Sequence, residues 1–324
     1  MFEKSNYLDF VEKSFTSCFR SKGYIEERPV DITSQVDKTV DFVGSKISAL
    51  KCYVLAEDYG EKGRFIIQNS MKLKTLKTIK SVEQQRFGSY YKCMGILAKP
   101  DVDLVVADTF DYFLNFLGFA YEDMCVKICS KDEDLVTAVK NLGIPVRMEI
   151  DKNTLEHYRH KYGMEKEKIT GRDFNIGIRK FGTDDFFTCA TFVLMETPER
   201  KIAIDMGVGN CSLSLCKFGT TSTISSSRMA DLIVIDSVEK EKFADALIAV
   251  SVLMKENVRN HVSSHFRKKF RQYMNAVSFW NEKFNYSCEE MVDVILTFLS
   301  MEYDEDYSIK RQEYLNVLRE SGIC

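Results

Sequence analysis

Glycine is absent from the chain between Gly219 and Gly322, and this gap limits the fold more than any other feature of the sequence. Helices commonly end at a glycine, so a long segment without one favours uninterrupted helices. From about residue 238 the sequence is typical of helix, whereas earlier residues mix apolar strand-like runs with glycine-bearing turns. We therefore predict a mixed α/β region at residues 1–235 and a helical region at residues 236–324.

Apolar runs typical of strands are grouped in the first region and do not alternate regularly with helices. Strands are expected near residues 50–55, 64–69, 126–130, 187–196 and 200–206, and helices over residues 5–22, 102–118 and 132–143. Regular βαβ alternation would indicate a parallel sheet, so the grouping favours an antiparallel α+β core. No internal repeat, P-loop or G-x-G-x-x-G motif is present.

The composition is that of an ordinary globular chain without a dominant charge. Of the 324 residues 45% are apolar, and the net charge is −3, so a local patch would have to hold any nucleic acid or membrane surface. No apolar run approaches about 18 residues and the N-terminus carries acids, which predicts no membrane span, no secretory signal and a cytoplasmic location. The ten cysteines form no C-x-x-C pair, which predicts mainly reduced core cysteines and no structural metal.

The segment IAIDMGVGNCSL, residues 202–213, predicts a buried strand that turns sharply into a helix. Two glycines one residue apart, Gly207 and Gly209, usually let the backbone come close to a ligand. The residues that follow carry no cation, although many nucleotide sites place one there. The segment therefore resembles a binding site that lacks its positive charge.

A lysine-rich stretch over residues 70–88 interrupts the regular pattern. It contains Lys72, Lys74, Lys77 and Lys80 and has no acidic residue before Glu83. Charge runs are usually solvated, so a solvated loop or hairpin is one interpretation. A loop that faces an anion is the other.

Residues 19–51 carry the most specific pattern, F-R-S-K-G followed by Asp37, Thr39 and Phe42. This region resembles the first motif of alanyl-tRNA synthetase. Weaker resemblances follow in the same order, at residues 67–72 and 86–97 for the second motif, 202–213 for the third, and 256–272 for the basic helix after it. The similarity extends from about residue 7 to residue 275.

The resemblance implies an α+β, class II synthetase-like core, an antiparallel sheet flanked by helices, followed by an all-helical C-terminal domain. That family adenylates alanine with ATP and magnesium and transfers it to tRNA, and its helical domain contacts the acceptor stem. This chain has no counterpart of the editing and C-terminal domains, so it resembles a stand-alone paralogue. ATP and Mg²⁺ are therefore the cofactors that the resemblance implies.

Class II enzymes bind the triphosphate with one arginine in motif 2 and another in motif 3, because charge builds on phosphate oxygens during transfer. The resemblance places Lys72 at the first position and Ser212 at the second, with Cys211 in place of an acidic residue beside it. Lysine keeps a charge without the bidentate fork, and serine keeps neither. A compensating cation could come from Arg86 or Arg228. The nucleotide-binding candidates are Lys72, Arg86 and Gly209.

The amino-acid pocket is expected around Asp205, Thr191 and Gly207. Asp205 matches the family aspartate that pairs with the ammonium group of the substrate. An aspartate that caps the following helix is the alternative. Ala190 and Thr191 replace the family's Trp-Asn pair, which implies a reshaped pocket and argues against a small-amino-acid preference.

Residues 255–271 hold six Lys or Arg against one acidic residue. The candidate tRNA contacts are Arg259, Arg267, Lys268 and Arg271. A solvated basic helix is the alternative interpretation. His261 and His265 have i, i+4 spacing, but the cations beside them oppose metal binding, and we predict no metal site there. His157 and His160 are interpreted as surface residues.

Three functions fit these residues. The first is a diverged, accessory or regulatory paralogue that binds an amino acid, an aminoacyl-adenylate, tRNA or a partner protein without completing aminoacylation, which the loss at Ser212 favours. The second is an active ATP-dependent amino-acid ligase in a specialised pathway, which Lys72 and Asp205 favour. The third is a purely structural subunit. No membrane partner is expected.

Overall fold

The computed structural model describes residues 3–164 and 166–323. Its centre is one sheet of nine strands in the order β1-β2-β3-β9-β8-β7-β4-β5, with β6 paired to β7. The pairs β1–β2 and β4–β5 are parallel, and the other six pairings are antiparallel. The strands are β1 (Ile25–Glu26), β2 (Gly63–Met71), β3 (Tyr90–Ala98), β4 (Met124–Ile128), β5 (Arg147–Ile150), β6 (Arg159–Lys161), β7 (Thr170–Arg179), β8 (Phe186–Glu196) and β9 (Lys201–Gly209). The expected α+β fold with a mainly antiparallel sheet is confirmed.

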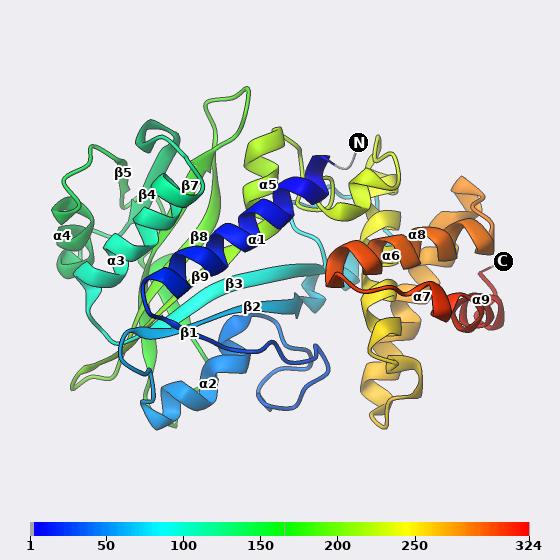
Figure 1. The fold of residues 1–324 in the computed structure, drawn as a ribbon, viewed down its shortest axis with the longest axis horizontal. Coiled ribbons are helices and arrows are strands. Elements are labelled where there is room, and N and C mark those ends of the chain that lie inside the picture. The colour runs from blue at the N-terminus through cyan, green and yellow to red at the C-terminus, as the bar shows by residue number, and fades with distance from the viewer. Residues whose placement is uncertain (1–2, 165, 324) are drawn as a thin grey trace.

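Helices cover both faces of the sheet, and four more gather at its β2–β3 end (Figure 1). The α-helices are α1 (Glu3–Ser21), α2 (Lys46–Ala56), α3 (Val102–Asp111), α4 (Glu133–Asn141), α5 (Asn210–Phe218), α6 (Val238–Lys255), α7 (Ser264–Phe284), α8 (Cys288–Tyr303) and α9 (Arg311–Glu320). Short turns of other helix types are η1 (Leu73–Thr78), η2 (Tyr112–Phe116), η3 (Tyr121–Asp123), η4 (Leu155–Tyr158), η5 (Arg228–Asp231), η6 (Val258–Asn260) and η7 (Ser308–Lys310). No helix within residues 3–164 and 166–323 is both long and apolar enough to cross a membrane.

The alternation of side chains along each strand divides the apolar residues between two cores. On β3, Ile96 packs into the core that α1, α3, α4 and α5 cover, whereas Leu97 packs into the core beneath α2. On β9, Ile204 faces the first core and Ala203 the second. Asp205 and Gly207 therefore lie on the α2 side of the sheet, and this alternation sets where the cavity forms.

The third core belongs to helices α6–α9. Ser237 caps α6 by accepting a hydrogen bond from the Lys240 amide, and α6 is buried along most of its length. Apolar residues of this core also come from the loop between β1 and α2 and from β2, including Ile32, Phe42 and Met71. The helical region thus packs directly on the sheet region. We propose a domain boundary between residues 235 and 236 only because the series of helices α6–α9 begins just after it, at Val238.

Several expected elements are present and two differ. The expected helix at 5–22 is α1, and the expected strand-to-helix change at 202–213 is β9 followed at once by α5. The strand expected at 50–55 is wrong, because these residues lie in helix α2, where Leu50 and Val54 share a buried face one turn apart. The helix expected over 102–118 is α3 continued by the π-turn η2.

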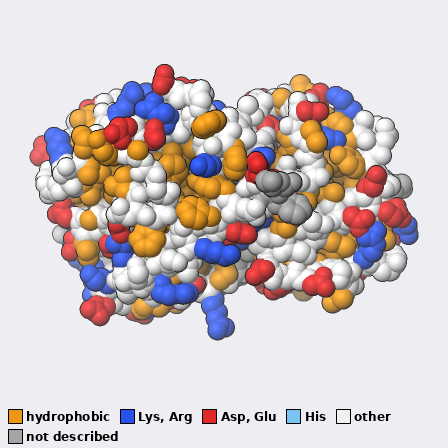
Figure 2. Space-filling view, turned by 45° about the horizontal axis from the view of Figure 1, so that its top comes forward, with side chains coloured by type: hydrophobic (Ala, Val, Ile, Leu, Met, Phe, Trp, Pro, Cys, Tyr) orange, Lys and Arg blue, Asp and Glu red, His pale blue; other side chains and the backbone are white. Residues whose placement is uncertain are grey.

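Charged side chains of both signs are interspersed over the face shown in Figure 2, and hydrophobic side chains gather over the sheet region in its left half. No field of one sign covers this face. Among the residues that the structure describes, eight cysteines are free, and Cys52 is the exposed one of these eight. The expectation of reduced core cysteines therefore holds for the other seven, which are buried.

Candidate functional site

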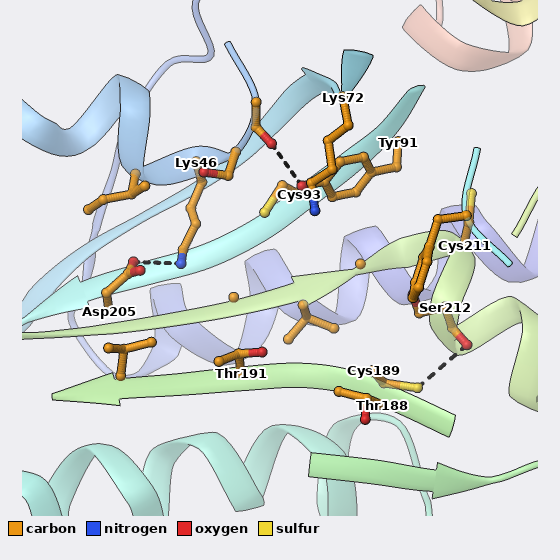
Figure 3. A pocket seen from close by; sticks show the side chains of 18 of the residues that line it. Lys46, Lys72, Tyr91, Cys93, Thr188, Cys189, Thr191, Asp205, Cys211 and Ser212 are labelled. Atoms are coloured by element: carbon orange, nitrogen blue, oxygen red, sulfur yellow. Dashed lines mark hydrogen bonds and ion pairs between the residues drawn. The ribbon is translucent and has the colours of Figure 1, made fainter. Parts of the chain in front are cut away.

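A cavity of about 420 Å³ lies on the α2 side of the sheet, above strands β3, β8 and β9 (Figure 3). Its floor follows from the strand registers, because Gly95 on β3 and Thr191 on β8 both pair with Gly207 on β9. Asp205 lies two residues before Gly207 on the same face, and the start of α5 closes the far end with Cys211 and Ser212. The three candidates of the amino-acid pocket therefore meet in one cavity.

Asp205 is paired with Lys46 at one end of this cavity. The Lys46 Nζ lies 2.5 Å from Asp205 Oδ1, and the two side chains are only 5% and 6% exposed. The Tyr162 hydroxyl donates to Asp205 Oδ2 at 3.2 Å. Burial, and then the charge of Asp205, raise the pKa of Tyr162 well above its ordinary value, so Tyr162 remains a neutral donor. Both carboxylate oxygens of Asp205 thus have partners from the chain itself.

The glycines of β3 and β9 make room for the Lys46 side chain. A β-carbon at Gly95 would collide with Lys46 Cε, and one at Gly207 would lie 2.8 Å from Lys46 Nζ. Gly209 has an ordinary φ of −87° and ends the strand, so the glycine pattern does not mark a tight turn. The close approach that the sequence predicted is real, but what comes close is a lysine of the protein.

Lys46 lines the cavity but was not singled out by any pattern in the sequence. It is the first residue of α2, directly after Ser45, and it belongs to the block that carries the most specific pattern. Its partner Asp205 is far away in the sequence, and nothing in either segment links the two. Gly95 and Gly207 are an indirect signal for the position of Lys46. A long side chain can lie across the face of a sheet only where no β-carbon blocks it.

The nucleotide candidates separate in the structure. Lys72 lines the cavity, and its Nζ lies 4.9 Å from the centre of the Tyr91 ring, so it is a cation held over an aromatic face. Gly209 also lines the cavity. Arg86 does not line it, since its guanidinium lies over the Phe187 ring, 5.9 Å from the ring centre. Of the lysine-rich stretch, Lys72 alone is among the cavity-lining residues that the structure describes.

Arg228 does not supply the missing cation. It is 1% exposed and forms ion pairs with Asp9 at 2.8 Å, Glu302 at 2.9 Å and Glu12 at 3.1 Å. This cluster ties α1 and η5 to α8, away from the cavity lining. No arginine lines the cavity in the described part of the chain, and Ser212 presents a hydroxyl where the resemblance implied a guanidinium.

His160 lines the cavity beside Lys161, and its side chain is 41% exposed, so it is a surface residue, as expected, that also borders the cavity. Strand β6 places it next to β7, where its Nδ1 contacts the carboxylate of the fully buried Asp173. Asp173 accepts a hydrogen bond from Asn175 at 3.4 Å, and Asn175 accepts one from Thr191 at 3.0 Å. A polar chain therefore leads from His160 to the cavity floor. His157 is exposed, as expected.

The basic candidates near α7 fall into two groups. Arg259 lies on η6 and pairs with Glu320, while Arg267 donates to the carbonyl of Val262 at 3.0 Å. Lys268 and Arg271 are exposed on α7, without an ion pair to the described residues. Arg267, Lys268 and Arg271 lie on α7, but Arg259 does not, because α7 begins only at residue 264, so the four residues do not share one helix.

His261 and His265 do not share one helix, contrary to the expected i, i+4 arrangement. His261 precedes α7 and accepts a hydrogen bond from the Ser263 amide at 3.0 Å, and His265 lies 3.1 Å from Asp41. Within residues 3–164 and 166–323, no group of three His, Cys, Asp or Glu side chains has the arrangement of a metal site.

No protein-family model matches the chain, and no curated protein matches its sequence. Three solved structures are similar to part of this chain: apo histidyl-tRNA synthetase from S. aureus (14% identity, TM-score 0.41, 71% of this chain and 68% of that chain), a pyrrolysyl-tRNA synthetase from Desulfitobacterium hafniense (10%, 0.38, 67% and 70%), and asparaginyl-tRNA synthetase from Pyrococcus horikoshii complexed with asparaginyl-adenylate (8%, 0.41, 70% and 68%). At these TM-scores the likeness says nothing about the chemistry of the cavity.

Proposed function

We propose that this chain is a synthetase-like protein that binds a small molecule in the cavity and does not activate it with ATP. It would serve as an accessory or regulatory relative of the alanyl-tRNA synthetases. The observation that supports this proposal is the set of charged groups that line the cavity. Asp205 is neutralised by Lys46, Ser212 offers no charge, and no arginine lines the cavity among the described residues.

Adenylation requires groups that stabilise negative charge on the phosphate oxygens in the transition state. Lys72 and Lys161 are the cations that could approach a triphosphate here, and neither offers the planar fork of arginine. Asp205 is the one carboxylate among the described lining residues, and Lys46 already occupies it. The lining therefore does not suit Mg²⁺, which prefers carboxylate and phosphate oxygens.

Exchange of labelled pyrophosphate into ATP in the presence of each amino acid tests this proposal. We expect exchange at background level, because each lost transition-state contact lowers the rate by about a hundredfold. An active aminoacyl-tRNA synthetase in the same assay is the positive control. Robust exchange with any amino acid would overturn the proposal and favour the second candidate, an active ligase, which Lys72 and Lys161 in the cavity support.

A tRNA-linked role is proposed from Lys268 and Arg271 alone, since Arg259 and Arg267 are held by contacts within the chain. Binding to bulk tRNA should then weaken with salt. Its log–log slope should be about −2 for two phosphate contacts, and Lys268→Gln with Arg271→Gln should abolish most of it. A slope that these substitutions leave unchanged would remove tRNA from the proposal.

A further inference from the structure

The end of the cavity at Asp205 already contains a cation. A buried carboxylate is costly unless a positive charge or hydrogen bonds compensate it. Asp205 receives both, from Lys46 at 2.5 Å and from the Tyr162 hydroxyl at 3.2 Å. A ligand ammonium would have to displace Lys46 and would meet its positive charge on the way.

Lys46 retains hydrogen-bonding capacity toward the cavity. An ammonium group carries three N–H donors. Within residues 3–164 and 166–323, the structure gives Lys46 Nζ one charged partner, Asp205, and no hydrogen-bond acceptor. Lys46 lines the cavity, and Gly95 and Gly207 leave its side chain flat against the floor. The remaining donors can therefore bind oxygen atoms of a ligand.

The other charged side chains of the cavity favour an anion as well. Lys72 and Lys161 line it, and neither forms an ion pair with a carboxylate in the described part of the chain. Because Lys46 and Asp205 cancel each other, these two lysines leave the wall positively charged. Charge complementarity selects a negatively charged ligand for such a wall.

We infer that Lys46 takes the place of a ligand ammonium, and that the cavity binds a small organic anion, a carboxylate or a phosphate, with no amino group at the Asp205 end. This inference rests on the proposed function, in which the cavity binds a ligand without adenylating it. It narrows the ligand class, because free amino acids and aminoacyl-adenylates both carry an ammonium group.

Chemical rescue tests the inference. Lys46→Ala removes three methylenes and the ammonium, which are the atoms of n-propylammonium. Adding n-propylammonium chloride should raise the Tm of this variant by about 2–4 °C. Wild type and Lys51→Ala, measured against KCl at the same ionic strength, should not respond. Lys51 is the matched control, because it is also a buried lysine of α2 paired with an aspartate, Asp37, and it does not line the cavity.

The absence of rescue in Lys46→Ala, or an equal response of all three proteins, would overturn the inference. If Lys46→Ala does not fold alone, folding in n-propylammonium chloride but not in KCl supports the inference, and failure in both overturns it. The double variant Lys46→Ala/Asp205→Asn lacks the carboxylate, so it should not respond to the amine. A response of the double variant would also count against the inference.

Anion probes provide the second arm. Acetate and inorganic phosphate should each be tested for a rise in the Tm of wild type that Lys46→Ala loses, and the stronger response tells carboxylate from phosphate. No response to either would contradict the inference. Pyrophosphate exchange is independent of these readouts. Exchange in wild type together with amine rescue would refute the proposed function and keep Lys46 as the ammonium substitute, whereas missing rescue without exchange would refute the inference alone.

Discussion

Helix α2 carries two buried lysines, and the surroundings of each decide what it can do. Lys51 Nζ donates to Asp37 and Thr39 at 3.1 Å each, and to the carbonyls of Tyr162 and Gly163 at 3.1 and 3.4 Å. Its donors are saturated by the protein. Lys46, one and a half turns earlier, pairs with Asp205 and faces the cavity.

The two pairs share their chemistry and differ in what surrounds them. A saturated, enclosed ion pair can only hold structure together, whereas a pair with unused donors beside a cavity can also bind a ligand. This contrast shows why a buried Lys–Asp pair is weak grounds for function until its remaining hydrogen-bonding capacity has been counted.

Lys51→Ala should produce the largest effect on stability. It leaves Asp37 buried without its cation and strips two carbonyls of their donor, so the free energy of unfolding should fall by about 3–5 kcal/mol. Urea denaturation followed by circular dichroism measures the change. If Lys51→Ala loses less free energy of unfolding than Lys46→Ala, Lys51 is not the more important of the two lysines for stability.

Lys46→Ala should destabilise the protein less, by about 2 kcal/mol. Water from the cavity can reach Asp205 once Lys46 is gone, and Tyr162 still donates to it. The same denaturation experiment, carried out beside Lys51→Ala and wild type, measures the difference. If Lys46→Ala loses as much free energy of unfolding as Lys51→Ala, or more, water in the cavity does not solvate the Asp205 carboxylate.

Acid should weaken the contribution of the Asp37–Lys51 pair to stability, because the pKa of Asp37 is lowered in the folded protein. Burial works to raise the pKa of Asp37, but hydrogen bonds from Thr39 and the charge of Lys51 outweigh it, and the pKa lies below its usual value. A depressed carboxylate pKa gives stability that is present above the unfolded pKa of about 3.9 and is lost as pH falls through the folded pKa.

Lys51→Ala should therefore lose less stability than wild type between about pH 5 and pH 2, because one cause of the low pKa is removed. Urea midpoints at several pH values across this range provide the measurement. This is the smallest effect of the series. Parallel curves for the two proteins would mean that Thr39 alone sets the pKa of Asp37.

The sequence predicted the sheet more readily than the site, for physical reasons. Helix α1 was found because Leu8, Val11 and Phe15 repeat at helical spacing. Helix α2 was taken for a strand because its apolar residues are dense and its short length carries little periodicity. Strand β7 was missed although Phe174 and Ile176 alternate with polar residues.

Some residues of the site could be predicted from the sequence and others could not. Asp205, Thr191, Gly207, Lys72 and Gly209 were named from the sequence, and all five line the cavity. Lys46 and His160 were not identified, because their roles come from contacts with Asp205 and Asp173 on other strands. Local sequence patterns predict secondary structure and burial. Which side chains meet across a sheet depends on the register of its strands, which these patterns do not give. Arg86 was named for a position that it does not reach.

We propose that Lys46 permanently occupies the ammonium position of the cavity. Calorimetric titration of wild type with matched ligands tests it most directly: L-alanine against L-lactate, and L-phenylalanine against L-3-phenyllactate, each pair differing only in an ammonium or a hydroxyl. We predict that at least one hydroxy acid binds at least about tenfold more tightly than its amino acid. Tighter binding of the amino acid in either pair would show that Lys46 does not hold this position, because Asp205 would then be open to a ligand ammonium.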